Sequence, residues 1–298
     1  MRFISANSST STRTFSAHDG TELAYHLLGE GAPVVCLPGG PADSAYLGDF
    51  GGLSAYRQLI RLDLRGTGRS ATPADTTSYR CDRLVDDVEA LRQHLGLDRM
   101  DLVAHCAGAN LATQYAVRHP ERVARLALIT PSVRAVGLTI SGDLRCETAR
   151  LREGEPWYPA AYAALEAIVA GDGSDWGAIS LFSYGRWDEV AQAHQAEMDA
   201  QMNREVMAGF GAEGAFDPEA TRAALAGFTS PVLLLAGEVD PGAPPRTVAE
   251  FAELFPSAGL VVQPGAAHHP WLDDAAGFSA TVGTFLGQGQ GGAMRHRH

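Results

Sequence analysis

The chain alternates between short apolar runs and stretches in which apolar residues recur every three or four positions. Continuous runs of valine, leucine and isoleucine are typical of strands that are buried on both faces of a sheet. Such runs predict strands at residues 21–28, 34–37, 57–64, 100–104, 123–130, 232–235 and 260–262. The pattern therefore indicates a sheet whose central strands have no polar face.

Helical spacing fills the intervals between these runs. The clearest case places Leu84, Val88 and Leu91 on one helix face. We expect Asp82 to cap this helix. The same spacing predicts further helices at residues 110–118, 158–170, 187–207, 247–255 and 275–286. Alternating strands and helices indicate an α/β fold, with a mostly parallel sheet covered by helices on both faces.

The region from residue 132 to residue 229 interrupts the alternation. Strand signals vanish there, and alanine-rich helical stretches replace them. We interpret this region as a helical cap inserted between two segments of one sheet. The prediction divides the chain into a first core part (1–131), the cap (132–229) and a second core part (230–298).

Both ends of the chain differ from its interior. Residues Met1 to Thr14 are rich in serine and threonine and lack the apolar centre of a secretion signal, so we expect a loose tail. The glycine-rich stretch from Gly287 to Gly292 predicts a second tail. No run approaches the roughly 20 apolar residues that span a bilayer, and the expected location is the cytoplasm.

Composition narrows the kinds of partner. Of the 298 residues, 45% are hydrophobic and 19% are charged, which is typical of a globular protein. The formal charge of −12 repels phosphate backbones, so we expect no nucleic-acid partner. The lack of a spanning apolar run predicts no membrane partner. The cysteines form no C-x-x-C pair, so we expect free thiols and no metal site. They are Cys36, Cys81, Cys106 and Cys146.

Cys106 carries the strongest chemical signal. It follows the apolar run from Leu102 to Ala104, and small residues and a helical stretch come after it. This strand–turn–helix context is that of a nucleophile elbow, G-x-S-x-G, with cysteine in the serine position. A thiol attacks carbonyl carbon as a hydroxyl does, and the thioester that it forms is a reactive acyl donor. The position therefore indicates acyl chemistry.

A thiol nucleophile needs a base, and the base needs an acid that fixes its tautomer. The chain supplies both downstream of Cys106, in the order acid and then histidine. The acid is Asp240, with Glu238 as its rival, on a loop after a predicted strand. The base is His268 or His269, after the next strand. We expect these loops to meet, because open α/β sheets place their sites at the carboxyl ends of strands.

An acyl intermediate also needs donors for its oxyanion. One expected donor is the backbone N–H of Ala107, directly after Cys106. The second is the backbone N–H of Gly40, in the glycine-rich loop that follows an early strand. The loss of one such donor typically slows a reaction roughly 100- to 1000-fold.

Five strings occur in a fixed order along the chain. They are Leu37-Pro38-Gly39-Gly40-Pro41-Ala42, Asp63-Leu64-Arg65-Gly66-Thr67-Gly68-Arg69-Ser70, Ala104-His105-Cys106-Ala107-Gly108, Gly237-Glu238-Val239-Asp240 and Ala267-His268-His269-Pro270-Trp271. Together they resemble the motifs of the α/β-hydrolase superfamily, and within it those of the proline-iminopeptidase-related branch. The resemblance covers nearly the whole chain. It implies the α/β-hydrolase fold and a triad of Cys106, Asp240 and His268 beneath a helical cap.

Several positions depart from the pattern of that branch. Cys106 replaces serine, Pro38 replaces the histidine of the first motif, and Ala42 and Ala104 replace glycines. Prolyl peptidases of the branch hold a substrate amine with acidic residues of the cap. Peptidase activity does not follow from the resemblance, since no acidic residue of this cap can be matched to that role.

The expected activity is cofactor-free hydrolysis of a small-molecule ester, thioester, lactone, amide or peptide through an acyl-Cys106 intermediate. One alternative is an acyltransferase or cyclase that releases the acyl group to an amine or alcohol. Another is a catalytically inactive ligand-binding protein on a hydrolase scaffold. Aromatic residues of the cap are candidates for an apolar pocket: Trp157, Tyr158, Trp176, Phe182, Tyr184 and Trp187.

Overall fold

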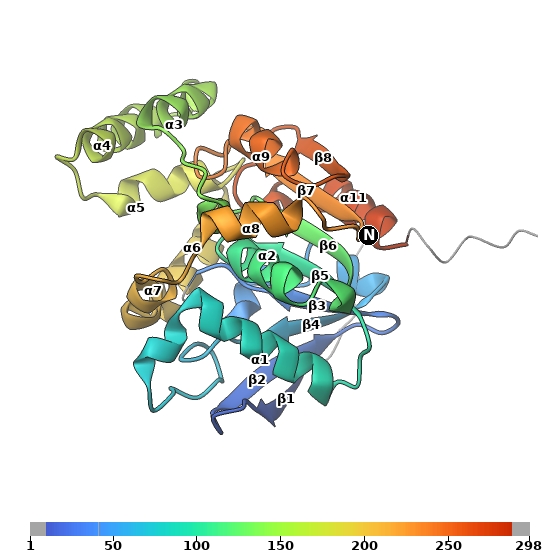
Figure 1. Ribbon diagram of the computed structural model, residues 1–298. Helices are drawn as coiled ribbons and strands as arrows, with labels where there is room; N and C mark the ends of the chain where they lie inside the picture. Colours follow the sequence, from blue (N-terminus) through green and yellow to red (C-terminus); the bar gives the residue numbers. More distant parts are fainter. Residues whose placement is uncertain (1–9, 41, 288–298) are drawn as a thin grey trace, which may run out of the picture.

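The computed structural model describes residues 10–40 and 42–287, so Pro41 and the tail expected after Gly287 lie outside the described residues. Its strands form one sheet in the order β1-β2-β4-β3-β5-β6-β7-β8 (Figure 1). They are β1 (Ser11–Ser16), β2 (Glu22–Leu28), β3 (Pro33–Leu37), β4 (Gln58–Leu62), β5 (Met100–His105), β6 (Val123–Ile129), β7 (Val232–Gly237) and β8 (Ala258–Gln263). Strands β3 to β8 pair in parallel, whereas β2 pairs antiparallel with both β1 and β4. The predicted mostly parallel sheet is confirmed.

The helices fall into two groups. The first group follows strands of the sheet and packs on it: α1 (Cys81–His94), α2 (Gly108–Arg118), α9 (Pro245–Ala252), α10 (Pro270–Asp273) and α11 (Ala275–Gly287). The second group lies between β6 and β7: α3 (Gly142–Ala149), α4 (Tyr158–Ala170), α5 (Trp176–Ile179), α6 (Glu189–Gln201), α7 (Arg204–Phe210) and α8 (Pro218–Leu225).

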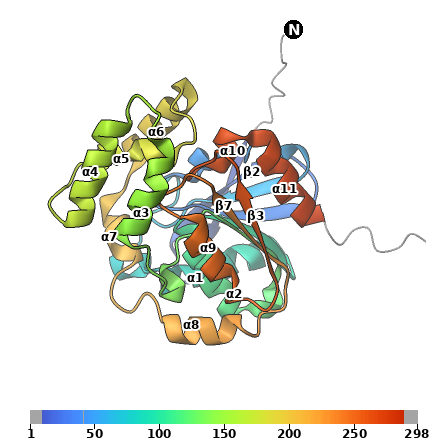
Figure 2. The same cartoon turned by 90° about the horizontal axis from the view of Figure 1, so that it is seen from above.

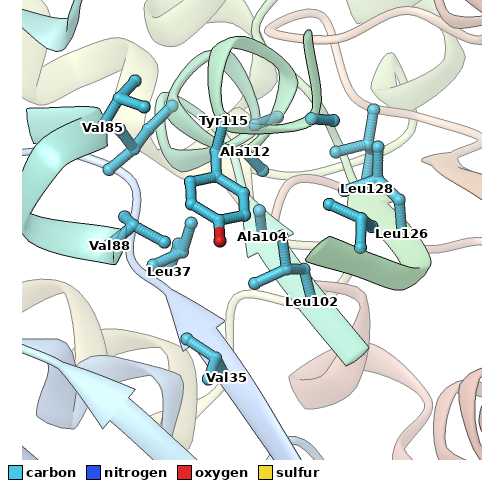
Figure 3. Packing of buried hydrophobic residues seen from close by; sticks show 14 of the residues in the cluster. Val35, Leu37, Val85, Val88, Leu102, Ala104, Ala112, Tyr115, Leu126 and Leu128 are labelled. Carbon is cyan, nitrogen blue, oxygen red and sulfur yellow. The ribbon is translucent and has the colours of Figure 1, made fainter. Parts of the chain in front are cut away.

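Alternate residues of the central strands enter two different hydrophobic clusters. In β3, Val35 and Leu37 join the cluster that α1, α2 and α9 cover, whereas Val34 and Cys36 join the one that α10 and α11 cover. Figure 3 shows the first cluster, with Tyr115 reaching from α2 toward β3 and β5. Because both faces of the strand are buried, its sequence is apolar at every position rather than at every second one.

The segment between β6 and β7 contains helices and no strand within the described residues. Helices α3, α4 and α5 lie together beside the sheet, outside the layers that α1, α2 and α11 form (Figures 1 and 2). They enclose a small cluster of their own around Phe182. Helix α8 lies against α2 instead, and its Leu225 is buried in the cluster beneath α1 and α2.

The structure corrects three local predictions. Residues 11–14, expected in a loose tail, lie in β1, which pairs with β2 although only Phe15 of the strand is buried. Asp82 does not cap α1, because Arg80 occupies the N-cap and Asp82 binds its side chain. The helix predicted at residues 187–207 is divided into α6 and α7, because the side chain of Asn203 caps α7 and starts a new helix there.

The turn that begins at Asp63 has a structural role. The buried Asp63 carboxylate accepts hydrogen bonds from the Ser44 hydroxyl at 2.6 Å, from the Arg69 backbone N–H at 2.9 Å and from His26 at 2.8 Å. Arg65 of the same turn donates two hydrogen bonds of 2.6 Å to Asp87 of α1. These bonds tie the loop after β4 to its neighbours, as expected for a buried charge, which is stable only when paired.

Candidate active site

Cys106 occupies the sharp turn between β5 and α2. Its backbone lies in the left-handed region, with φ at 50°, a conformation that costs a non-glycine residue about 1–2 kcal/mol. Hydrogen bonds on both sides hold the turn: the Cys106 N–H donates to Ile129, and its carbonyl accepts from Ala109 and Ser132. The strain lifts the thiol out of the strand end, so the local geometry is that of a nucleophile elbow.

Cys106 differs from the other cysteines in exposure. Cys36, Cys81 and Cys146 are buried, whereas Cys106 is partly exposed, and all four are free thiols. Burial raises the pKa of Cys36 to about 12, despite the nearby Arg61 charge. A thiol with such a pKa is not a nucleophile near neutral pH, which leaves Cys106 as the accessible candidate.

His268 and Asp240 lie beside Cys106. The Nδ1 atom of His268 is 2.7 Å from Oδ2 of Asp240, and the Cys106 thiol interacts with the same imidazole closely enough to raise its pKa. Asp240 is 1% exposed, and its Oδ1 accepts the Gly242 N–H at 2.7 Å. Because a carboxylate only accepts, Nδ1 of His268 carries the hydrogen and Nε2 is available to the thiol.

The electrostatic environment stabilises the charged form of His268 that forms when it accepts a proton. Burial disfavours its charged form, but the Asp240 charge, followed by that of Cys106, outweighs burial and raises the pKa of His268 well above its ordinary value. A base with a raised pKa takes a proton from a thiol more readily than free imidazole does. The arrangement can therefore support proton transfer from Cys106 to His268.

Three separate segments fix the backbone of His268. Its N–H donates to the Ser183 carbonyl at 3.0 Å, in the inserted segment. Its carbonyl accepts from Thr130 Oγ1 and His105 Nε2, each at 2.9 Å, at the ends of β6 and β5. The loop that carries His268 is thus held by β5, by β6 and by the segment between β6 and β7 together.

The two rival residues lie in different environments. His269 is buried, and its Nδ1 is 3.1 Å from the Ser183 carbonyl rather than beside a carboxylate. Glu238 is exposed and accepts the Gly265 N–H at 2.7 Å. The structure brings Cys106, His268 and Asp240 together and leaves both rivals out of the group.

The glycine-rich loop after β3 lies against the nucleophile turn. A Cβ atom on Gly39 would lie 2.5 Å from Cβ of Cys106 and 3.0 Å from the Ala107 nitrogen, so only glycine fits there. Gly40 has φ at +78° and open space around it. The two expected oxyanion donors, Gly40 and Ala107, therefore flank the closest approach of the two loops.

Tyr46 is a residue of this site that the sequence did not single out. Its hydroxyl accepts the Gly39 N–H at 2.6 Å and lies 2.7 Å from Nδ1 of His105. Because His105 donates through Nε2 to the His268 carbonyl, its Nδ1 accepts the Tyr46 proton. His105 therefore links the glycine loop to the histidine loop. No motif signals this bond, which exists only after the loops have met.

A pocket of about 430 Å³ lies between the inserted helices and the loops of Asp240 and His268, both of which line it. Of the aromatic residues expected to shape a pocket, Trp176 and Phe182 line it, and Trp157 and Tyr158 instead pack against Phe182. The pocket is concave, mostly apolar and adjacent to a titratable pair, which are the usual features of a small-molecule site.

One cluster has the residue types of a metal site. His26, Asp43 and Asp63 bring one potential ligand atom each within 4.8 Å of one another. Hydrogen bonds already occupy both nitrogens of His26, from Thr12 at 2.9 Å and with Asp63 at 2.8 Å. We therefore assign no metal to this cluster.

Among the described residues, no helix is both long enough and apolar enough to span a bilayer.

The sheet order, the elbow and the adjacent histidine and aspartate define an α/β hydrolase. The sequence profile of the alpha/beta hydrolase fold matches residues 32–275, and the chain belongs to that family. It is 27% identical over 273 residues to the proline iminopeptidase of Heyndrickxia coagulans, covering 87% of this chain and 91% of that protein. The 2-hydroxymuconate semialdehyde hydrolase of Pseudomonas sp. (strain CF600) is also 27% identical, over 290 residues, covering 92% and 94% of the two chains.

Solved structures support the same family relationship. The crystal structure of the proline iminopeptidase of Mycobacterium smegmatis superposes with a TM-score of 0.71 at 26% identity, covering 93% of this chain and 97% of that chain. The expected relationship to proline iminopeptidases is confirmed. Named relatives include a peptidase and a hydrolase of a different kind of substrate, so the chain is a hydrolase-family member whose fold is compatible with more than one substrate class.

Proposed function

We propose that this protein is a hydrolase that acts through a covalent acyl-cysteine intermediate on a small-molecule ester, thioester, lactone or activated amide. One observation carries the proposal: the partly exposed Cys106, on a strained turn, interacts with a histidine that Asp240 binds at 2.7 Å. Nucleophile, base and orienting acid in this relation are the general requirement for nucleophilic acyl transfer.

In the acylation step, His268 takes the proton of the Cys106 thiol through Nε2, and Sγ attacks the carbonyl carbon of the substrate. The tetrahedral intermediate places its negative charge on the former carbonyl oxygen. The backbone N–H groups of Gly40 and Ala107 stabilise this oxyanion. When the carbon–leaving-group bond breaks, the imidazolium of His268 gives its proton to the leaving group and the acyl group remains on sulfur.

In the deacylation step, His268 takes a proton from water, and the resulting hydroxide attacks the thioester carbonyl. The bond to sulfur breaks, the carboxylic acid leaves, and the proton on His268 returns to the Cys106 sulfur. Asp240 keeps the imidazole in the required tautomer and stabilises its charged form in both steps. The cycle consumes one water and needs no cofactor.

The test compares turnover of nitrophenyl esters, thioesters and lactones by the wild type, Cys106→Ala and Cys106→Ser. Cys146→Ala is the matched control, because Cys146 is also a free cysteine but is buried. We expect Cys106→Ala to lose at least about 1000-fold in kcat, since the covalent route is removed, and Cys146→Ala to stay within about twofold.

Product analysis with an added amine distinguishes the two acyl-transfer outcomes: free acid as the main product supports hydrolysis, and amide as the main product supports a transferase. Full turnover by Cys106→Ala on every accepted substrate contradicts the proposal. Reversible binding of substrates with no turnover and no covalent mass gain supports a ligand-binding protein instead.

A further inference from the structure

The pocket above the site contains one charged side chain that the proposed reaction does not use. Arg145 of α3 lines it, together with the catalytic-site candidates Asp240 and His268. Much of the remaining wall is apolar and comes from the inserted helices: Leu165, Ile168, Val169, Trp176, Ile179 and Phe182. No acidic residue of the inserted segment lines the pocket, and Asp240 is its one carboxylate.

Arg145 is only partly satisfied by the protein. Its Nη1 donates to the Pro241 carbonyl at 2.8 Å, and no carboxylate within the described residues lies within ion-pair distance of it. Both oxygens of Asp240 are already engaged, by His268 and by the Gly242 N–H. The guanidinium has five N–H donors, so most of its hydrogen-bonding capacity is available to the pocket.

Arg145 is half-buried, and two fully buried arginines have carboxylate partners, whereas a third, Arg61, bonds only the Ala45 and Gly48 carbonyls. Arg65 pairs with Asp87 and Asp19, and Arg152 pairs with Glu155 and also donates to the Tyr184 carbonyl. Removing a cation from water is unfavourable unless an anion compensates it. Burial lowers the pKa of Arg145, an effect that the Asp240 charge opposes, and a guanidinium nevertheless stays protonated in proteins.

The geometry points to a carboxylate-binding subsite: we propose that Arg145 binds a carboxylate of the substrate, whose apolar portion occupies the pocket and whose acyl carbon reaches Cys106. This inference rests on the proposed function, since it names the substrate class of the same site. A planar carboxylate accepts two parallel hydrogen bonds from a guanidinium, and apolar walls strengthen such a pair by excluding water. The formal charge of −12 repels an anionic substrate, and a cation in the pocket offsets this repulsion locally.

The decisive experiment uses a matched pair of substrates. One is the mono-4-nitrophenyl ester of glutaric acid, which has a free carboxylate, and the other is its carboxamide, which has the same shape without the charge. We expect the wild type to favour the carboxylate by about 10- to 100-fold in kcat/KM. In Arg145→Met this ratio falls to about 1, and Arg145→Lys, which keeps the charge without the planar fork, gives an intermediate ratio.

Arg150→Met is the control, because Arg150 is an exposed arginine of the same segment and does not line the pocket. It keeps the wild-type ratio. Equal kcat/KM for the two substrates in the wild type overturns the subsite, as does an unchanged ratio in Arg145→Met. An equal decrease in kcat/KM for both substrates also overturns it, because Arg145 would then act by supporting the loop of Pro241.

A binding measurement separates this inference from the proposed function. Thermal unfolding of Cys106→Ala is followed with 5-phenylpentanoate and with 5-phenylpentanamide. We expect the acid to raise Tm and the amide not to, and we expect no rise for the Cys106→Ala/Arg145→Met double variant. Equal shifts for acid and amide, or no shift, overturn the subsite. The proposed function fails separately, if Cys106→Ala retains turnover.

Discussion

At the scale of single residues, the site depends on close approaches that tolerate no extra atoms and on the paired charges of Asp240 and His268. Cys106, Asp240 and His268 could be proposed from motif order, because each follows a predicted strand. Arg145 and Tyr46 could not, since an arginine on a short helix and a tyrosine in a single 3-10 turn have no local signal. Their contacts exist only once segments that are distant in sequence have packed together.

Asp240→Asn is expected to lower kcat by about 100-fold or more, because the amide cannot stabilise the charged imidazole and favours the wrong tautomer of His268. Steady-state kinetics of Asp240→Asn and Glu238→Gln test this, and the Glu238 variant is expected to stay within about twofold. If Glu238→Gln loses activity and Asp240→Asn does not, the acid has been assigned to the wrong side chain.

Gly39→Ala is expected to reduce kcat/KM by at least about tenfold, since its Cβ would lie 2.5 Å from Cβ of Cys106 and must displace the nucleophile turn. Gly154→Ala is the control, because nothing lies within 4 Å of a Cβ at that position. Both kcat/KM and the midpoint of unfolding are measured for the two variants. A Gly39→Ala protein with wild-type kcat/KM would mean that the turn is not held closely by the loop.

At the scale of elements, apolar runs identified the buried strands because both of their faces are covered. The same reasoning missed β1, whose sequence Ser-Thr-Arg-Thr-Phe-Ser buries only Phe15 and lies at the edge of the sheet. It also joined α6 to α7, since the helical spacing continues across the Asn203 cap. These two errors concern elements that owe their form to strand pairing or to capping rather than to burial. The short helices α3, α5 and α8 were not individually predicted.

Tyr46→Phe tests the link between loop elements. The variant leaves the Gly39 N–H and His105 Nδ1 without a partner, and we expect it to lower the free energy of unfolding by about 1–3 kcal/mol and to lower kcat. Tyr25→Phe also removes a buried tyrosine hydroxyl that bonds a histidine, His94 at 3.2 Å, but far from the elbow. It should cost stability without changing kcat; equal kinetic losses in both variants would refute a specific role for Tyr46.

At the scale of the whole molecule, the loops after β3, β5, β7 and β8 all lie at the carboxyl ends of the strands. The helices between β6 and β7 lie beside the sheet (Figure 2). Parallel pairing places these carboxyl ends together, which is why chain order alone was sufficient to propose the site. It was not sufficient to say which of the six candidate aromatic residues line the pocket. Trp176 and Phe182 do, because of how α3, α4 and α5 pack, and no motif records that packing.

The buried histidines predict a loss of global stability in acid. Burial, followed by the charges of neighbouring histidines, lowers the pKa of His269 well below its ordinary value, and the pKa of His105 is lowered in the same way. Below pH 6.5 the unfolded chain therefore binds protons that the folded chain excludes, so stability decreases as the pH falls through this range toward the folded pKa values.

His269→Phe is expected to reduce this pH dependence. The phenyl ring keeps the stacking on Tyr184, whose ring centroid lies 4.8 Å away, and removes one buried titratable group. The slope of unfolding free energy against pH between 6 and 5 should become shallower by about 1 kcal/mol per pH unit. Denaturant unfolding at these pH values measures it, and an unchanged slope would show that protonation of His269 is not coupled to unfolding.

The central claim is that the acyl group of the substrate is carried on the sulfur of Cys106, and acid quench during the first turnover followed by peptide mapping tests it most directly. The account predicts an acyl mass on the peptide that contains Cys106, removable by hydroxylamine as a thioester is, and no such mass in Cys106→Ala. An acyl group found on another residue, or undiminished turnover by Cys106→Ala with no adduct, would contradict it.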